Sequence, residues 1–415
     1  MNPTERLRKL GIAVPSILVP GAGTAPETWS VIACDQFSSD RAYWEETRRI
    51  VGNDPSTLDL IIPECYLEDG DREQRADAAN AAMAEILERG VLNRLDPGFV
   101  LVDRSTLFAP RRRGLVLAID LEAYDFSEGS VSAIRPTEGT IRDRLPPRMA
   151  VRRGASLDLP HVLLLIDDPE DTVMKAASAA AGAKIYDFDL MQKGGHVSGR
   201  HVAEQEMAAL ADAFEGLVSS SGLLFAVGDG NHSLASAKEI WKEKKAAGAS
   251  GDHPARFALV EVENIHDDGL HFHPIHRVLF GADAADTAGF LRRRLGAEEG
   301  RGGADGVGLV MPDGSDTVLS FGIPAGRLAV EPLQEALDAY LTEHPEVYID
   351  YIHGEDSVRE LVGASKDRVG LVLPELDKTV FFKRISEVGP YPRKTFSIGE
   401  AVEKRYYLEA RKLSD

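Results

Sequence analysis

Short apolar runs alternate with helix-forming segments between residues 162 and 263 of the sequence. The apolar runs have the length of strands and lie at residues 162–166, 223–227 and 257–262. Amphipathic helical segments separate them, at residues 202–217 and 233–245. Runs that are apolar throughout, rather than at every second position, are typical of strands buried on both faces of a sheet. The alternation therefore predicts a mixed α/β core.

The length of the chain, 415 residues, exceeds that of one ordinary domain. Before the core, a helical pattern covers residues 72–91, and strand patterns cover residues 99–102 and 115–121. After it, strand patterns occupy residues 308–311, 317–321 and 369–373, with a helical pattern at residues 331–343. We predict three units: an N-terminal α/β unit at residues 1–130, a core at residues 131–280, and a C-terminal α+β unit at residues 281–415.

The composition is that of a globular protein with a strongly acidic surface. Hydrophobic residues make up 43% of the chain, and the formal net charge is −20. Because nucleic-acid binding needs a basic surface, we expect no nucleic-acid partner. The sequence shows neither a signal-peptide pattern nor an apolar run of membrane-spanning length, and its two cysteines, Cys34 and Cys65, form no CxxC pair. We predict a cytoplasmic protein with reduced thiols and no membrane partner. A homodimer is compatible with the sequence, which does not fix the oligomeric state.

The stretch FAVGDGNHSLASAKEIW, residues 225–241, places a polar glycine-rich turn between a strand and a helix. Such a turn presents free backbone N–H groups and the positive end of a helix dipole to an anion. The predicted phosphate-binding residues of the turn are Gly230, Asn231, His232 and Ser233. Asp229 would repel a phosphate, so an acid at this position indicates Mg²⁺ binding or proton transfer. The alternative is an ordinary turn in which the polar side chains only cap the helix.

A second polar segment, AIRPTEGTIRDRLPPR at residues 133–148, concentrates arginines around one glutamate. The planar guanidinium group of arginine can donate two parallel hydrogen bonds to a phosphate or a carboxylate. We assign Arg142 and Arg144 to phosphate binding, and Arg135 and Thr140 to substrate binding. Glu138 is either a catalytic base or the salt-bridge partner of the arginines. The alternative for the whole segment is a solvated charge run.

Two further segments contain candidate ligand contacts. Residues 185–202 form a second glycine-rich polar loop ahead of a helix, which is either mobile or folds over a ligand. Its candidate phosphate contacts are Lys193, His196 and Arg200. Residues 266–278 carry four histidines without a cysteine or an HExxH pattern, so a half-exposed strand is favoured over a metal site. Here His276 and Arg277 are the candidate substrate contacts.

Near the N-terminus, the stretch WSVIACDQF at residues 29–37 ends an apolar run with two polar residues, Asp35 and Gln36. Functional side chains in α/β proteins often lie at the ends of strands, so Asp35 and Gln36 are candidates for a functional site. A simple turn explains the same pattern. Cys34 lies in the apolar part and is interpreted as a packing residue.

Taken together, these segments resemble a known family. The DGxH turn, the preceding ExTxxDRL segment, the YDFD…GG loop and the later PIHRV segment are similar to a bacterial and archaeal family of unknown function that is often labelled ParB-like. The resemblance covers most of the chain, from WSVIACDQF to PRKTFSIGEA. That family is placed in the ParB/sulfiredoxin-like superfamily, which includes nucleotide-binding segregation proteins, sulfiredoxins and free serine kinases.

The resemblance implies a ParB/sulfiredoxin-like α/β core with N-terminal and C-terminal α+β extensions. In that superfamily a turn at a helix start contacts phosphates, and Ser233 stands here where an arginine is usual. Asp229 and Glu138 match acidic residues that carry phosphoryl transfer in the free serine kinases. Sulfiredoxin chemistry is excluded because the turn has no cysteine, and the acidic chain argues against a DNA-binding partition protein.

The predicted function is a phosphotransferase that moves a phosphoryl group from pyrophosphate or a nucleotide to a small hydroxyl compound, with free L-serine as the favoured acceptor. Phosphoryl transfer needs mainly positioning and charge stabilisation, which these residue types supply. The predicted cofactor is Mg²⁺ held by Asp229, and the predicted partners are the small-molecule substrate and the phosphate donor. The alternative is a non-catalytic, ParB-like regulator that binds a nucleotide or a metabolite.

Overall fold

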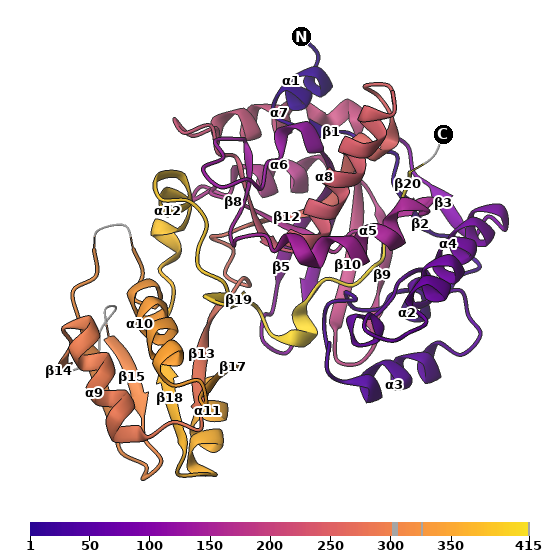
Figure 1. Cartoon of the computed structure of the whole chain (residues 1–415). Coiled ribbons are helices and arrows are strands. Elements are labelled where there is room, and N and C mark those ends of the chain that lie inside the picture. Colours follow the sequence, from indigo (N-terminus) through magenta and orange to yellow (C-terminus); the bar gives the residue numbers. More distant parts are fainter. Residues whose placement is uncertain (301–305, 325–326, 414–415) are drawn as a thin grey trace. The chain divides into compact units, whose positions relative to one another are not determined.

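The computed structural model describes residues 1–300, 306–324 and 327–413 (Figure 1). Its chain forms two compact units. The first contains residues 1–270 together with the C-terminal residues from Glu400 on, and the second contains residues 271–399. The predicted fold class, mixed α/β, is confirmed.

A mixed nine-stranded sheet forms the centre of the first unit. Its strands are β1 (Ile12–Ala13), β4 (Gly98–Ser105), β5 (Arg112–Asp120), β6 (Ile134–Pro136), β8 (Leu163–Ile166), β9 (Lys184–Leu190), β10 (Gly195–Ala203), β11 (Phe225–Asp229) and β12 (Phe257–Asn264). Their order is β6-β11-β8-β12-β5-β4-β10-β9, with β1 paired to β5. The pairs β6–β11 and β8–β12 are parallel. The strands β6 and β9 therefore lie at opposite ends of this order.

Both faces of this sheet are buried, as the continuous apolar runs predict. Phe99 and Leu101 of β4 pack into one core with residues of α6, α7 and α8. Val100 and Val102 pack into a second core with Trp29 and other N-terminal residues. The helices of the unit are α1 (Pro3–Lys9), α2 (Pro26–Trp29), α3 (Arg41–Val51), α4 (Arg72–Glu88), α5 (Leu145–Arg153), α6 (Thr172–Ala180), α7 (Met207–Gly216) and α8 (Asn231–Ala246). Two small sheets pair β2 (Leu18–Pro20) with β3 (Leu92–Arg94), and β7 (Leu157–Asp158) with β20 (Arg411–Lys412).

The structure does not divide the chain at the boundaries expected from the sequence. Residues 1–130 and the expected core share one sheet, because β5 pairs along its length with β12 and β4 pairs with β10. Hydrogen bonds between strands join segments that lie far apart in the sequence, so no boundary exists near residue 130. The second boundary lies about ten residues earlier than expected, since the strand that begins at Phe272 pairs within the second unit.

The glycine-rich segment at residues 185–202 is a β-hairpin rather than a loop. Strands β9 and β10 pair in antiparallel register, from Gly195 opposite Leu190 to Arg200 opposite Lys184. A left-handed backbone at Lys193 (φ 67°) and Gly195 (φ 84°) closes the turn. The helix expected from residue 202 begins at Met207 instead, because residue 202 still belongs to β10.

The second unit is an antiparallel sheet with helices on both faces, in agreement with the predicted α+β class. Its strands are β13 (Phe272–Phe280), β14 (Glu298–Gly300), β15 (Gly306–Val310), β16 (Asp316–Ser320), β17 (Tyr348–His353), β18 (Arg368–Val372) and β19 (Phe396–Ile398). The helices are α9 (Ala284–Leu295), α10 (Val330–Glu343), α11 (Glu355–Gly363) and α12 (Phe381–Glu387). Apolar residues of α9 and α10 build one core of the unit, and α11 packs against Val278 and Val310.

Residues 400–413 form what we call the C-terminal strap, a mostly extended segment of the first unit (yellow in Figure 1). Its Tyr406, Tyr407 and Leu408 are buried in the same core as Val100 and Val102 of the central sheet. The strap also forms bridges with the N-terminal part of the chain, between Ile32 and Tyr406 for example. The strap and the N-terminal residues from Ile17 on therefore cover the same face of the sheet.

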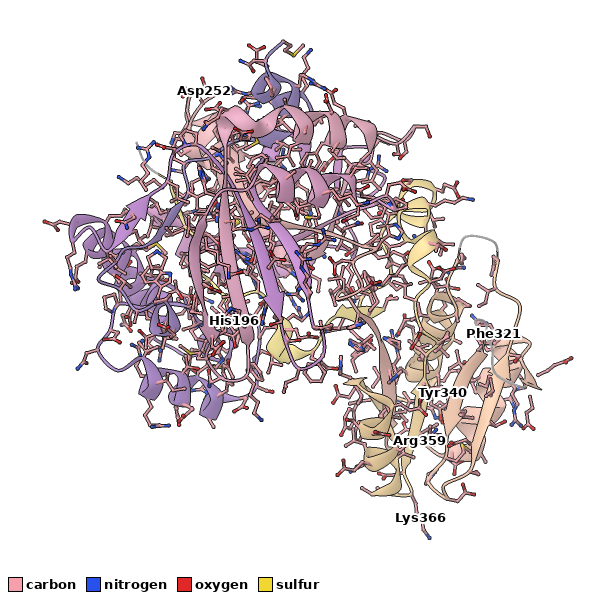
Figure 2. All side chains as sticks on the ribbon, turned by 180° about the vertical axis from the view of Figure 1, so that it is seen from behind. His196, Asp252, Phe321, Tyr340, Arg359 and Lys366 are labelled. Carbon is pink, nitrogen blue, oxygen red and sulfur yellow. The ribbon has the colours of Figure 1, made fainter. Side chains whose placement is uncertain are left out.

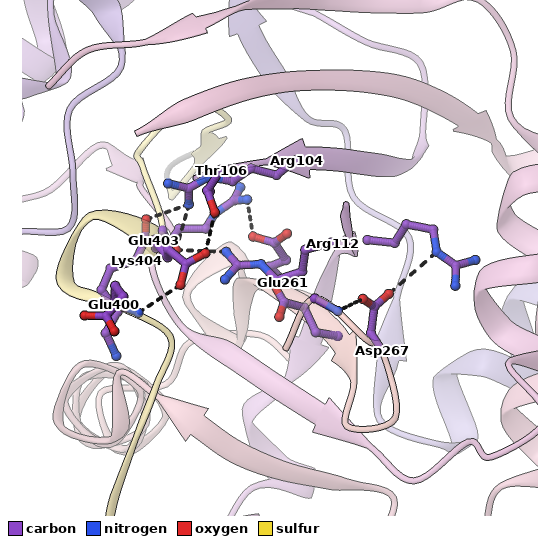
Figure 3. Close-up of polar contacts among 12 residues, drawn as sticks. Arg104, Thr106, Arg112, Glu261, Asp267, Glu400, Glu403 and Lys404 are labelled. Atoms are coloured by element: carbon purple, nitrogen blue, oxygen red, sulfur yellow. Dashed lines mark hydrogen bonds and ion pairs between the residues drawn. The ribbon is translucent and has the colours of Figure 1, made fainter. Parts of the chain in front are cut away.

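Arg104 on β4 holds the strap in place (Figure 3). Its guanidinium donates hydrogen bonds to the carbonyl oxygens of Val402, Glu403 and Lys404, each at 2.8 Å. The same group donates to the carbonyl oxygen of Gly194 in the β9–β10 turn, at 2.8 Å. Burial and the neighbouring Arg112 lower the pKa of Arg104 to about 10. The side chain is therefore still charged at neutral pH, which strengthens these bonds.

Further buried charges around Arg104 are paired, as their burial requires. Arg112 donates to the Glu403 carbonyl at 2.9 Å and contacts the Glu263 carboxyl of β12 at 3.0 Å, although burial raises the pKa of Glu263 to about 8. From the strap, Arg405 forms an ion pair with Glu261, also on β12. These contacts attach the strap to three neighbouring strands of the sheet, β4, β5 and β12.

We predict that Arg104→Lys destabilises the first unit by about 3 kcal/mol, because a lysine cannot replace the guanidinium fork and leaves buried carbonyls without donors. Urea unfolding measures the change, and amide hydrogen exchange of the strap is expected to accelerate. Arg111→Lys is the control, since Arg111 is 60% exposed and pairs with Asp103 on the surface. Equal losses for the two variants would show that Arg104 does not anchor the strap.

Candidate functional site

Two parallel strands end side by side at one edge of the central sheet. Pro136 of β6 pairs with Val227 of β11, and both chains run in the same direction. The Thr137 hydroxyl donates to the Val227 carbonyl at 2.7 Å, which continues this alignment past the last strand pair. Glu138 and Asp229 each lie two residues beyond the Pro136–Val227 pair. The parallel register therefore brings the two predicted acidic residues to the same edge of the sheet.

At this edge the turn after β11 leads into helix α8. Gly230 has a left-handed backbone (φ 78°), and a Cβ at this position would lie 3.0 Å from Val162. No side chain caps the helix. The first N–H groups of a helix have no partner within the helix, so this end of α8 can bind an anion. Of the alternative prediction, in which polar side chains satisfy local N–H groups, the structure shows one contact, from the Gly230 N–H to Asp229, and no side-chain cap of the helix itself.

The polar side chains of the turn are engaged in other ways. The Asp229 carboxylate accepts the Gly230 N–H at 2.8 Å. Ser233 forms a hydrogen bond with His161 at 3.0 Å. The amide oxygen of Asn231 is buried and has no hydrogen-bond partner among the described residues. A buried acceptor without a partner in the protein can be satisfied by a water molecule or by a ligand.

The segment after β6 meets the turn directly. The backbone N–H of Ile141 donates to Nε2 of His232 at 3.3 Å. Residues 142–144 form the short helix η4 (Arg142–Arg144) immediately after this contact, and both of its arginines are exposed. Arg142 lies over the ring of Phe126 at 5.5 Å. The structure therefore brings the segment with Arg142 and Arg144 to the turn at the start of α8, and leaves both arginines at the surface.

Lys404 of the C-terminal strap supplies a cation that the sequence did not indicate. Its ammonium group forms an ion pair with the Asp229 carboxylate at 3.0 Å, and its side chain is 13% exposed. Burial alone would raise the pKa of Asp229, but Lys404 and His161 outweigh it, so the pKa is lowered. Asp229 is therefore an ionised carboxylate at neutral pH, with its charge balanced by the strap.

Beyond Ser233, a chain of polar side chains leads away from the turn. Nδ1 of His161 lies 2.9 Å from the Tyr407 hydroxyl, which in turn lies 3.1 Å from the Cys34 sulfur. Burial, and next the charge of Asp35, raise the pKa of the Cys34 thiol to about 12. The thiol is therefore protonated at neutral pH and is no nucleophile, which supports its interpretation as a packing residue.

These residues line a cavity of about 150 Å³ within the first unit. Its polar lining includes Cys34, Asp35, Arg148, His161, Ser233 and Tyr407. Its apolar lining comes from aliphatic side chains of the N-terminal segment, helices α4 and α5, and strand β12. Because Ser233 belongs to both the cavity wall and the turn at the start of α8, the two features are adjacent.

The predicted contacts on the β9–β10 hairpin do not join this site. The strands β8, β12, β5 and β4 separate β10 from β11 in the sheet order. His196 lies on β10 (Figure 2) and contacts the carboxylates of Asp189 at 2.7 Å and Asp187 at 2.8 Å, which raise its pKa. Arg200 lies 3.6 Å from Asp103, and Lys193 is exposed in the hairpin turn. The glycines that suggested a ligand loop serve the hairpin instead.

The predicted substrate contact Arg135 is a structural residue. Its guanidinium is buried and donates to the carbonyl oxygens of Ser132 and Ser221, each at 2.8 Å. Thr140, predicted alongside it, lies in the segment next to the turn, where the Tyr124 phenol is its buried neighbour.

His276 and Arg277 belong to β13 of the second unit, whereas Asp229 belongs to the first. Nδ1 of His276 accepts the Leu373 N–H at 3.1 Å, and burial lowers the His276 pKa. Arg277 is fully buried and lies over the Tyr351 ring at 5.2 Å. The charge of Arg277 suggested a ligand contact, but these interactions hold strands of the second sheet together.

Sequence reasoning missed Lys404, His161 and Tyr407. Lys404 and Tyr407 lie in an extended segment without glycine or a turn signal, and His161 is an isolated histidine after Pro160. The one signal that pointed to this cavity was the position of Asp35 after an apolar run, where a simple turn was an equal alternative.

These features define a mixed α/β protein of two compact units, with a polar turn at a helix start in the first unit. The family model described as a protein of unknown function (DUF1015) matches residues 18–340, and the chain belongs to that family. No curated protein is significantly similar to the chain. None of the helices in the described residues combines the length and the apolar character needed to span a membrane.

Several solved structures are distantly similar. A conserved hypothetical protein from Pyrococcus furiosus shares 11% identity, with 72% of this chain and 95% of that chain covered and a TM-score of 0.38. A free serine kinase in complex with AMP shares 13% identity, with 72% and 92% covered and a TM-score of 0.40. SbnI with a C-terminal truncation, from Staphylococcus aureus, shares 13% identity, with 68% and 82% covered and a TM-score of 0.37. At these values the similarity establishes no shared activity, and the ParB-like label stays a prediction.

We predict that Lys404→Met raises the pKa of Asp229, because burial then acts without the compensating ammonium. In the wild type the pKa of Asp229 in the folded state is lower than its unfolded value of about 3.9. The ionised carboxylate therefore stabilises the fold fully above the unfolded value. This stabilisation is lost as the pH falls through the pKa of the folded state. The difference in unfolding free energy between wild type and Lys404→Met is therefore expected to be constant above about pH 5 and to shrink below about pH 4. Lys366→Met, at an exposed turn of the second unit, is the control. A difference that is independent of pH would contradict this role of Lys404.

Proposed function

We propose that this protein is a phosphotransferase that moves a phosphoryl group from pyrophosphate or a nucleotide to a small hydroxyl compound. The observation that carries the proposal is the placement of two acidic residues: Glu138 follows β6, and Asp229 ends the neighbouring parallel strand β11, which leads into the N-terminus of α8. An anion site with adjacent proton-accepting groups is what phosphoryl transfer requires.

The donor phosphate binds at the start of α8 in this proposal. The backbone N–H groups of residues 231–233 donate to its oxygens, as at other helix N-termini. Lys404 lies next to this turn through its ion pair with Asp229 and supplies positive charge close to the transferred group. Arg142 and Arg144 lie exposed on the neighbouring segment and are available to the distal part of the donor.

Mg²⁺ is the proposed cofactor, and the residues at this edge fit it. The oxygen atoms of Asp229, Glu138 and Asn231 are the ligand type that Mg²⁺ prefers, and Mg²⁺ in such sites is held by one or two carboxylates together with substrate phosphates. When bound, the ion would neutralise charge on the donor. The Asp229 carboxylate already balances the Lys404 ammonium, so a ligand role for Asp229 requires that ion pair to rearrange.

The two carboxylates have different roles in the proposed reaction. The acceptor hydroxyl oxygen forms a bond to phosphorus while the bond from phosphorus to the leaving oxygen of the donor breaks, and the hydroxyl proton passes to a carboxylate. Because Lys404 and His161 lower the pKa of Asp229, that residue is a weak proton acceptor. We therefore assign the proton to Glu138, and assign Asp229 to the positioning of Lys404 and of the cation.

The ion pair between Lys404 and Asp229 is also compatible with the alternative function, a regulator that binds a nucleotide or a metabolite without catalysis. A carboxylate already balanced by Lys404 is also what a binding site without chemistry would contain. The two functions differ in one measurable respect: a regulator binds a nucleotide and forms no phosphorylated product.

Phosphorus NMR tests the proposal directly. The wild-type protein is incubated with Mg²⁺, L-serine and one donor at a time, namely pyrophosphate, ADP, ATP or CTP. A phosphoserine resonance with one donor is expected. Binding of a donor without any new resonance, across a panel of hydroxyl compounds that includes L-serine, would favour the regulator.

Variants of the two acids separate their roles. We predict that Glu138→Gln slows transfer by about 10²- to 10⁴-fold with little change in stability, because it removes the proton acceptor. Asp229→Asn is expected to slow transfer and also to weaken donor binding, since Lys404 loses its partner. Glu128→Gln, at an exposed position before β6, is the matched control. An unchanged rate for Glu138→Gln would remove that residue from the mechanism.

Removal of divalent cations gives a further test. We predict that EDTA abolishes transfer and that added Mg²⁺ restores it, because phosphate donors react as their metal complexes in such sites. Full activity in EDTA would contradict the cofactor assignment and would leave Lys404 and the arginines as the source of positive charge.

A further inference from the structure

We propose that Ser233 and His161 form a nucleophile and its general base, with which the first unit hydrolyses esters of short-chain aliphatic carboxylic acids. This activity needs neither a phosphate donor nor Mg²⁺, so it is separate from the proposed phosphotransferase. Three features support it: a hydrogen-bond network that fixes the tautomer of His161, the start of helix α8, and the cavity that Ser233 and His161 both line.

The Ser233 hydroxyl lies within hydrogen-bond distance of an imidazole. Its Oγ is 3.0 Å from Nε2 of His161, and Nδ1 of the same ring is 2.9 Å from the Tyr407 hydroxyl. A serine hydroxyl bonded to one ring nitrogen, while a third group holds the other, is the arrangement of an activated serine nucleophile. The imidazole can act as the base only if Nε2 is unprotonated, so the tautomer of His161 decides the chemistry.

Tyr407 determines which ring nitrogen of His161 carries the proton. Burial raises the pKa of Tyr407 well above its ordinary value, so the phenol is neutral and has one proton to donate. The phenol donates this proton to the Cys34 sulfur at 3.1 Å, and its oxygen accepts the Cys34 N–H at 3.2 Å. The contact with Nδ1 of His161 is therefore donated by the imidazole, which leaves Nε2 to accept the Ser233 hydroxyl.

The Asp35 carboxylate favours proton transfer from Ser233 to His161. One of its oxygens lies 3.7 Å from Nε2 of His161, which is longer than a hydrogen bond but close enough for attraction between charges. When Nε2 takes up the Ser233 proton, the ring becomes a cation, and the negative charge of Asp35 stabilises it. This attraction is strongest after the proton has moved, so it favours the activated serine.

The N-terminus of α8 can stabilise the negative charge that develops on the carbonyl oxygen of an ester. Ser233 is the third residue of this helix, and no side chain caps the helix. The first N–H groups of a helix have no partner within the helix and carry partial positive charge. Backbone N–H groups in this role form an oxyanion hole. The proposed nucleophile therefore lies next to the groups that such a reaction requires.

The cavity next to Ser233 has the size of a short acyl chain. Its volume is about 150 Å³, and both Ser233 and His161 belong to its wall. Most of the wall is aliphatic and includes Leu60, Ile62, Met83, Val151, Leu157 and Leu259. A cavity of about this volume holds a molecule of the size of benzene, so an acyl chain of about four to six carbon atoms fills it. Burial of this chain supplies binding energy for the ester.

The proposed hydrolysis has two steps that use the same base. In the first step, Oγ of Ser233 forms a bond to the carbonyl carbon, its proton passes to Nε2 of His161, and the alcohol leaves with that proton as its bond to the carbon breaks. In the second step, a water oxygen forms a bond to the acyl carbon and gives a proton to Nε2. The bond to Ser233 then breaks, Oγ takes the proton back, and the carboxylic acid leaves.

Labelling with diisopropyl fluorophosphate tests the nucleophile without turnover. The phosphorus of this reagent forms a bond to an activated serine oxygen while fluoride leaves. Intact mass and peptide mapping are expected to show one label per chain, on Ser233, in the wild type and in Ser236→Ala. Ser236 is the matched control because it lies on the same helix and its hydroxyl donates to the His232 carbonyl at 2.7 Å. An unlabelled wild type, or a label on another residue, would overturn the assignment of Ser233.

Two further variants test the role of the base. His161→Gln is expected to slow labelling by about 10²- to 10⁴-fold, the range for general-base catalysis. If this variant fails to fold, Tyr407→Phe replaces it, since loss of the phenol oxygen removes the acceptor that fixes the tautomer, and slower labelling is again expected. Labelling of either folded variant at the wild-type rate would contradict a base at His161.

Hydrolysis of nitrophenyl esters, measured in EDTA without a phosphate donor, tests the activity itself. The butyrate ester is expected to react faster than the decanoate ester, whose chain exceeds the cavity. Ser233→Ala is expected to be at least about 10²-fold slower on the butyrate ester. Ala155→Leu, at a half-buried position of the wall, is expected to slow the butyrate ester more than the acetate ester. Butyrate hydrolysis at the same rate in wild type and Ser233→Ala would overturn the proposed activity.

Discussion

The buried guanidinium of Arg104 is the contact on which the architecture of the site depends. It binds three consecutive carbonyl groups of the C-terminal strap and one in the β9–β10 turn, all at 2.8 Å. The guanidinium group of this one residue thereby attaches the C-terminal segment of the chain to the central sheet. Two strap residues reach the site as a result: Lys404 binds Asp229, and Tyr407 contacts His161. The charge balance at Asp229 is therefore set by a segment outside the matched family region at residues 18–340.

The site combines two kinds of surface. The turn at the start of α8 offers backbone N–H groups and charge, which suit a phosphate. The adjacent cavity has a mainly aliphatic wall with a polar part that includes Asp35, Arg148 and His161. Ser233 belongs to both, because its backbone lies in the first turn of the helix and its hydroxyl contacts His161 in the cavity. The proposed transfer would use the turn for the donor and the cavity for the acceptor, with the two groups held close together.

Several strands and the turn at Asp229 were predictable because their signals are local. Residues 223–227 are apolar throughout and a glycine-rich turn follows, and the structure has β11 and α8 there. The β9–β10 hairpin was not predictable, since its glycines and charges also fit a mobile loop. Local patterns likewise could not show that Arg135 and Arg277 are buried structural residues, because exposed and buried arginines look the same in a sequence.

The sequence by itself determined the α/β class, the strand–turn–helix unit at Asp229 and the presence of a second acid at Glu138. Apolar periodicity and the residue preferences of turns extend over only a few residues, so a short segment of sequence is enough to recognise them. Only the tertiary structure decided that Glu138 and Asp229 end neighbouring parallel strands, and that Lys404 reaches Asp229 from 175 positions away in the chain. Strand register and long-range ion pairs follow from packing of the whole sheet, and no local pattern encodes them.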